Sequence, residues 1–146
     1  KVMAVLVVLT VPPKLMLLGA VPGLAQGEPE VNCDSPQTTL EMNICAGRSQ
    51  RASEAAMQAA YQKVRQAYRD QMAENAAIPE LKTYSNQRLQ ALAADQQAWL
   101  KYRKTHCNWA SSKFAGGTIR PSIEASCLTR LNQERSQVLL ADLEEG

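Results

Sequence analysis

The sequence predicts an all-α fold: a disulfide-stapled bundle of three main helices, with a short extra helix at its N-terminal end and a signal peptide before it. Three observations predict this. Apolar residues recur at helical spacing in long segments rich in Ala, Gln, Arg and Glu. β-branched residues are sparse beyond the leader, so no strand is expected. The four cysteines, Cys33, Cys45, Cys107 and Cys127, all follow the leader, which indicates an oxidising compartment.

The leader has the composition of a cleavable export signal. Two apolar runs, residues 2–9 and 15–20, follow a basic start. The small residues of Gly23-Leu24-Ala25 predict cleavage before Gln26. Lys14 and two prolines interrupt the apolar stretch, whereas a spanning helix needs about 20 unbroken apolar residues. We therefore expect an exported, periplasmic or secreted chain that keeps no membrane anchor after cleavage.

The expected organisation is a signal peptide over 1–25, a polar linker over 26–32 and one helical domain over 33–146. Of the 16 basic residues, Lys1 and Lys14 lie in the leader, which leaves 14 against 14 acidic residues. Because the domain carries no net charge and no basic cluster, nucleic-acid binding has little electrostatic support.

The first predicted helices follow a start signal at Asp34-Ser35-Pro36, a capping residue with proline at the first turn. A short helix is expected over 38–45, and Gly47 is expected to kink or interrupt it. A longer helix is expected over 50–74. Its apolar stripe consists of Met57, Tyr61, Val64 and Tyr68.

A break at 75–79 separates this helix from a second one, expected over 85–106. Residues 108–120, which include two glycines, are expected to form a loop. A third helix is expected from Pro121 to about residue 143, with an inner side built of Ile123, Leu128, Leu131, Val138 and Leu139.

Polar residues interrupt the apolar stripe of the second helix. Gln96 and Arg103 lie on the same face as Trp99, and buried polar groups need partners. In an antiparallel bundle, a rise of 1.5 Å per residue places Glu54 and Arg135 level with Trp99. We therefore expect a polar network in which Glu54 pairs with Arg103 or Arg135 and one guanidinium stacks on Trp99.

The chain resembles the LprI lysozyme-inhibitor N-terminal domain family of secreted bacterial proteins over roughly residues 33–140. The resemblance is carried by Gln-x2-Trp-x3-Arg-x3-Cys on one helix and by a four-cysteine frame around it. The matching residues are Cys33, Thr39, Glu41, Cys45, Glu54, Tyr61, Gln96, Trp99, Arg103, Cys107, Gly116, Gly117, Cys127 and Arg135. The chain departs from the pattern where Met57-Gln58 replaces Leu-Asn and where Asn132 replaces Thr.

The resemblance implies a secreted helical module, and some members of the family inhibit lysozyme. It also implies that neighbouring cysteines pair, Cys33 with Cys45 and Cys107 with Cys127, although four cysteines allow three pairings and cross-pairing at one end of the bundle remains the rival. A continuous helix from residue 34 would hold the first pair about 17 Å apart, too far for a disulfide. The Cys33 segment must therefore fold back along the helix.

The residues suited to catalysis are few. His106 is the single histidine, and a nucleophilic Cys107 beside it would need a free thiol. We therefore expect no enzymatic activity, no cofactor and no metal site.

A protein-binding module that acts by steric occlusion, with lysozyme as its candidate partner, is the preferred function. The candidate recognition element is the 108–120 loop, with Trp109, Lys113, Phe114 and Arg120. Alternatively, Trp109 and Phe114 only cap the open end of the bundle. The alternative function is an envelope structural or stress-related module without inhibitory activity. The sequence does not indicate an oligomeric state.

Overall fold

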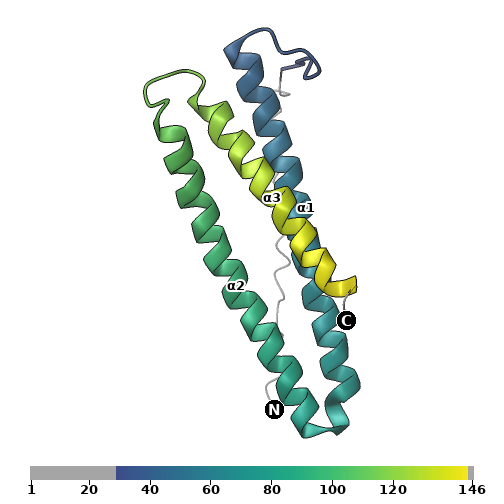
Figure 1. Cartoon of the computed structure of the whole chain (residues 1–146). Coiled ribbons are helices and arrows are strands. Elements are labelled where there is room, and N and C mark those ends of the chain that lie inside the picture. Colours follow the sequence, from purple (N-terminus) through teal and green to yellow (C-terminus); the bar gives the residue numbers. More distant parts are fainter. Residues whose placement is uncertain (1–28, 145–146) are drawn as a thin grey trace, which may run out of the picture.

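The computed structural model describes residues 29–144, so the expected signal peptide at 1–25 lies outside the described residues. The elements are α1 (Thr39–Glu74), the short 3-10 helix η1 (Asn75–Ala77), α2 (Pro79–Ser112) and α3 (Arg120–Glu144). α1 and α2 form a long antiparallel hairpin, and α3 returns along it, most extensively against α1 (Figure 1). The tip of the hairpin extends beyond the end of α3. The predicted all-α class is confirmed, with no strand among the described residues.

The expected short N-terminal helix is continuous with α1 rather than separate from it. The helix begins after Thr38, whose hydroxyl accepts a hydrogen bond from the Glu41 backbone N–H at 3.2 Å. The Glu41 carboxylate accepts one from the Thr38 backbone N–H at 3.0 Å, which completes a capping box. The helix thus begins close to residue 38, where it was expected to begin, but its capping residue is Thr38 and not Asp34. The expected interruption at Gly47 was wrong. A single interior glycine costs a helix only about 1 kcal/mol, which a long packed helix tolerates.

α2 is longer at both ends than its apolar stripe predicts. It begins with Pro79 at its first turn, where a missing backbone N–H costs nothing, and it runs to Ser112. The expected loop at 108–120 was therefore too long: residues 108–112 are helical, and the connection to α3 is a short turn with Gly116 at φ 80°. Trp109 consequently lies on a helix.

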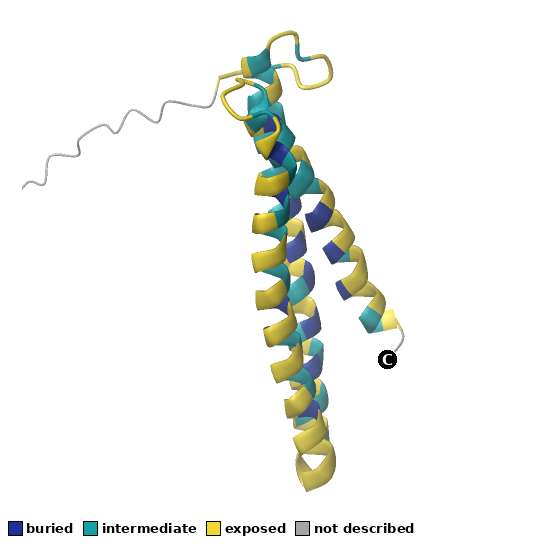
Figure 2. Cartoon of the chain, turned by 60° about the vertical axis from the view of Figure 1, so that its left-hand side comes forward, coloured by how far each residue is buried: buried dark blue, intermediate teal, exposed yellow. Residues whose placement is uncertain are grey.

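The apolar core is narrow and is built mainly by α1 and α3. Its buried centre is Ala60, Val64, Tyr68 and Leu139, against which the half-buried Leu89 and Leu92 of α2 pack. By contrast, the buried residues of α2 are Ser85, Gln96, Cys107 and Ser111. Figure 2 shows the buried residues as short segments spaced along the helices, between exposed and half-buried ones. α2 is therefore held by polar contacts and a disulfide as well as by apolar packing. Within residues 29–144, none of the helices combines the length and apolar character needed to cross a bilayer.

A polar cluster closes the core near the end of α3. The Tyr68 hydroxyl donates to Asp142 Oδ2 at 2.6 Å and accepts from Arg88 Nη2 at 2.9 Å. The Arg88 guanidinium carbon lies 4.3 Å from the centroid of the Tyr68 ring. Burial of the phenol raises the pKa of Tyr68, and its hydrogen bond to the Asp142 carboxylate raises it further. The cluster therefore favours the protonated phenol in the folded state.

This raised pKa predicts that the domain loses stability in strong base through Tyr68. The contribution of a group whose folded pKa is raised is complete below its unfolded value, about 10 for tyrosine, and is lost as the pH rises through the folded value. Between about pH 8 and about pH 11, the free energy of unfolding should therefore fall more steeply for the natural chain than for Tyr68→Phe. Urea unfolding at the two pH values measures the difference. Tyr84→Phe, at a 60% exposed tyrosine, should follow the natural chain; parallel curves for Tyr68→Phe would contradict the prediction.

Candidate functional site

Arg103 of α2 links all three helices. Its Nη2 donates to Glu54 Oε1 of α1 at 3.1 Å, and its Nη1 donates to Asn132 Oδ1 of α3. The Asn132 amide, which is fully buried, in turn donates to Ser53 Oγ at 3.0 Å. The guanidinium carbon of Arg103 lies 5.2 Å from the Trp99 ring centroid. The Nε–H of Arg103 is buried without a partner among the described residues. Even so, each terminal nitrogen binds a different neighbouring helix.

Arg135 of α3 approaches the same tryptophan. Its Nε donates to Gln96 Oε1 at 3.0 Å, its Nη2 donates to Asp95, and its guanidinium carbon lies 5.6 Å from the Trp99 ring centroid. The Gln96 amide also contacts Met57 Sδ at 3.1 Å. Trp99 thus lies within cation–π distance of two guanidinium groups that come from different helices. We call Glu54, Asp95, Gln96, Trp99, Arg103, Asn132 and Arg135 the Trp99 clamp.

The structure brings together the five residues that the sequence indicated for a polar network, namely Glu54, Gln96, Trp99, Arg103 and Arg135. Tyr61, which the family resemblance grouped with them, is not part of the network. Its ring packs against the apolar core and lies under the Arg65 guanidinium at 5.5 Å. Sequence reasoning missed Asp95 and Asn132. Asp95 precedes Trp99 by four residues, a spacing that puts both on one helix face, so this signal was present in the sequence.

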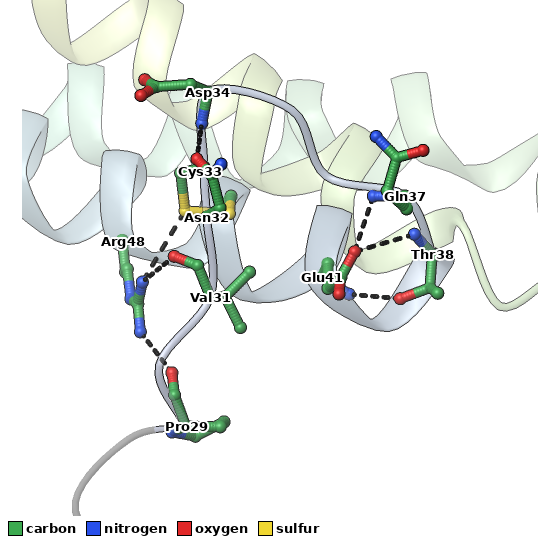
Figure 3. The surroundings of a disulfide bond; sticks show 10 residues. Pro29, Val31, Asn32, Cys33, Asp34, Gln37, Thr38, Glu41 and Arg48 are labelled. Carbon is green, nitrogen blue, oxygen red and sulfur yellow. Dashed lines mark hydrogen bonds between the residues drawn. A yellow bond between two sulfur atoms is a disulfide. The ribbon is translucent and has the colours of Figure 1, made fainter.

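Two disulfides, Cys33–Cys45 and Cys107–Cys127, fasten the end of the bundle that holds the α2–α3 turn. This is the neighbour pairing that the family resemblance implies. The Cα atoms of Cys33 and Cys45 are 5.4 Å apart because the N-terminal segment folds back along α1. Figure 3 shows how Arg48 holds this segment, donating to the carbonyl of Pro29 at 2.7 Å and of Val31 at 3.3 Å.

The second disulfide ties α2 to α3, with Cα atoms 5.6 Å apart. Asn43 of α1 joins the same end: its Nδ2 donates to the Thr118 carbonyl at 2.9 Å, and its Oδ1 accepts from the Ser122 backbone N–H at 3.0 Å. Arg120 closes the turn from within, because its Nη2 donates to Asn108 Oδ1 at 2.8 Å. The turn is therefore braced from all three helices.

The four residues expected in a recognition loop have different settings. Trp109 lies on α2 and is 71% exposed. Lys113 is the C-cap of α2, with its ammonium 5.3 Å from the ring centroid of Phe114, which is half-buried. Arg120, as the first residue of α3, braces the turn instead of projecting from it. The expectation of a four-residue recognition loop was thus wrong in its geometry, since the exposed tryptophan belongs to a helix.

Trp109 continues a row of rings that the sequence analysis missed. Tyr102 and His106 have ring centroids 5.2 Å apart, and His106 and Trp109 have centroids 5.7 Å apart. Their spacing of four and three residues puts the three rings on one face of α2. This row was missed because α2 was expected to end at His106. We call Tyr102, His106 and Trp109 the aromatic ladder.

The cysteine and histidine that were weighed as candidates for catalysis are both engaged in contacts. Cys107 is in a disulfide and offers no thiolate nucleophile, and the His106 ring contacts the two neighbouring rings of the ladder. Among the residues that the structure describes, no group of three or more His, Cys, Asp or Glu is placed to hold a metal ion. The Trp99 clamp joins the three helices to one another, whereas Tyr102 and Trp109 of the aromatic ladder are exposed to solvent.

Removal of the Glu54 carboxylate should destabilise the domain, because it leaves the largely buried Arg103 guanidinium without its anionic partner. We expect Glu54→Ala to lower the free energy of unfolding by about 1–3 kcal/mol and the melting temperature by several degrees. The matched control is Glu134→Ala, which removes an exposed pair with Arg130 within one helix and should cost at most about 0.5 kcal/mol. Equal thermal shifts for the two variants would contradict the structural role of the clamp.

Removal of the Cys107–Cys127 disulfide should also destabilise the domain. The cross-link closes 20 residues of separation, and its loss in Cys107→Ser plus Cys127→Ser should lower the free energy of unfolding by about 3 kcal/mol through the unfolded chain. Urea unfolding monitored by tryptophan fluorescence measures this, with the oxidised natural chain as reference. An unchanged midpoint would show that the bond contributes nothing to the attachment of α2.

Comparisons with known proteins agree with these features. The family model described as lysozyme inhibitor LprI matches residues 32–139. An uncharacterized protein of Rhizobium meliloti (strain 1021) is 30% identical over 125 residues, which cover 86% of this chain and 87% of that protein. No solved structure matches significantly. The chain belongs to the LprI family of lysozyme inhibitors.

Proposed function

We propose that the protein is an exported, non-enzymatic inhibitor that binds a lysozyme-like glycosidase and blocks its cleft. Membership of the LprI family supports a lysozyme-like protein partner. Two disulfides, with no free cysteine among the described residues, support an oxidising compartment outside the cytoplasm. Inhibition of this kind requires only a rigid surface that fills the space a substrate would occupy.

The observation that carries the proposal is the exposed Trp109 beside the braced α2–α3 turn. A large aromatic side chain that is 71% exposed is the type of residue that anchors protein interfaces. Phe114 and Lys113 lie next along the chain, at the same end of α2. Because the Cys107–Cys127 disulfide and Arg120 hold this end, little conformational entropy would be lost on binding.

The basic residues of α2 and the turn would suit the carboxylates of a glycosidase cleft. No acidic residue occurs between Asp95 and Glu124, whereas this stretch contains five basic residues, Lys101, Arg103, Lys104, Lys113 and Arg120. Glycosidases commonly act through two carboxyl groups that flank the scissile bond. A cation presented beside an aromatic anchor would pair with such carboxylates, and Lys113 is the exposed cation closest in sequence to Phe114 and Trp109.

The variant Trp109→Ala plus Phe114→Ala should abolish inhibition while leaving the fold intact. Loss of an anchor typically costs 2 kcal/mol or more, which is roughly a 30-fold loss of affinity. The assay is hydrolysis of a soluble oligosaccharide by c-type lysozyme, paired with co-elution of the two proteins on size exclusion. A soluble substrate is needed because a protein that coats cell walls would also slow lysis of whole cells without touching the enzyme.

Tyr84→Ala is the control, since Tyr84 is an exposed aromatic residue of the same helix near the hairpin tip. It should inhibit and co-elute as the natural chain does. If the double variant inhibits normally, this end of α2 is not the inhibitory surface. If the natural chain neither co-elutes nor inhibits, the envelope module without inhibitory activity becomes the better account.

A further inference from the structure

We propose that the aromatic ladder is a binding site for an anionic glycan strand, a ligand distinct from the enzyme partner. The ladder is Tyr102, His106 and Trp109, successive rings on one face of α2. The inference rests on the proposed function only for the exported location, which brings the protein within reach of a wall glycan.

The rings form a platform of the kind that sugars stack on. The faces of aromatic rings carry negative charge density, which attracts the C–H groups that line one face of a pyranose. Centroid separations of 5.2 and 5.7 Å are comparable with the repeat of neighbouring sugars in a β-1,4-linked strand. The planes turn by 31° and 51° from one ring to the next, so the platform twists along its length. Successive rings are therefore placed to contact successive sugars.

The ladder is not part of the protein's interior. Tyr102 is 51% and Trp109 is 71% exposed, whereas the other tryptophan, Trp99, lies between two guanidinium groups. Aromatic side chains gathered on an exposed face mark interaction sites in soluble proteins. A ligand that matches the ladder would have a flat, partly apolar face, and a sugar ring has one.

The charges that α2 carries beside the ladder favour an anionic ligand. Lys101, Lys104 and Lys113 are exposed, and the ion pairs among the described residues include none of them. Lys113 follows Trp109 by four residues and so extends the ladder's own face. Towards the hairpin tip, the first acid of α2 is Asp95, which Arg135 binds. Nothing acidic on α2 at this level would repel a carboxylate.

A small recess ends the ladder. It has a volume of about 280 Å³ and is lined by Trp109, Ala110, Ser112 and Lys113, slightly smaller than the usual ligand pocket of about 300 Å³ or more. A lining that includes an indole ring and a lysine suits one sugar whose substituent carries a carboxylate. The ladder and the recess together would bind a short stretch of an acidic amino-sugar polymer such as peptidoglycan.

Sedimentation with purified peptidoglycan sacculi tests this inference on the oxidised mature chain. The natural chain should sediment with sacculi and much less with chitin, whose sugars carry no charge, and added salt should weaken retention. Tyr102→Ala plus Trp109→Ala should reduce retention at least tenfold. Tyr84→Ala, which removes a 60% exposed tyrosine from the same helix, should leave retention unchanged. All these side chains are exposed, so unchanged thermal unfolding confirms that the variants fold.

No sedimentation of the natural chain, or equal losses in the ladder and Tyr84→Ala variants, would overturn the proposal. Equal retention on chitin and on sacculi would overturn the proposal that the ligand is anionic. A ladder variant that turns a dimer into a monomer on size exclusion would identify the ladder as a self-association surface instead. Because co-elution with lysozyme is measured without any glycan, failure here leaves the inhibitor proposal standing, and the reverse also holds.

Discussion

The attachment of α2 depends on the contact between Trp99 and two guanidinium groups. The buried residues of α2 are serines, a glutamine and a cysteine, so a continuous apolar seam does not hold this helix. Arg103 reaches from α2 to α1 and α3, and Arg135 reaches back from α3 to α2. Burying two guanidinium groups destabilises the folded state unless each of their buried N–H groups donates to an acceptor. The clamp meets that requirement almost completely, since the Nε–H of Arg103 is the one buried side-chain donor without a partner among the described residues.

Such a clamp fixes the register of the helices more tightly than apolar packing does. An apolar stripe tolerates a slip of one turn at modest cost, whereas a slip here would separate Glu54 from Arg103 and Gln96 from Arg135 together. Buried polar groups serve in this way to set register in coiled coils. The Cys107–Cys127 disulfide then fixes the same register at the end of the bundle. The aromatic ladder lies on α2 beside these two constraints, from Tyr102 to just beyond Cys107, so the rings are held on a rigid support.

The sequence predicted the helices and much of the clamp because both depend on regular geometry. Apolar spacing marks three helices, and a constant rise per residue places Glu54 and Arg135 level with Trp99 in antiparallel neighbours. The ends of the helices were harder to predict, because they depend on contacts between residues that are distant in sequence. The polar run at 108–112 is typical of a loop, but the disulfide at Cys107 and the bonds of Arg120 lie beside it in the fold. The expected break at Gly47 failed for the same reason, since α3 packs along α1. The aromatic ladder could not be predicted from the sequence, because the expected helix ended before Trp109.

The two proposed ligands meet at Trp109, and this sets a relation between them. An enzyme that covers the α2–α3 turn would bury the same indole on which a glycan would stack. Two ligands that need one side chain exclude each other, and by linkage each lowers the affinity for the other by the same factor. A strand already bound along α2 would therefore keep the inhibitor from the enzyme, and a bound enzyme would release the strand. Tyr102 and Phe114 separate the two activities, because Tyr102 lies on the ladder, towards the Trp99 clamp, while Phe114 lies in the turn beyond Trp109.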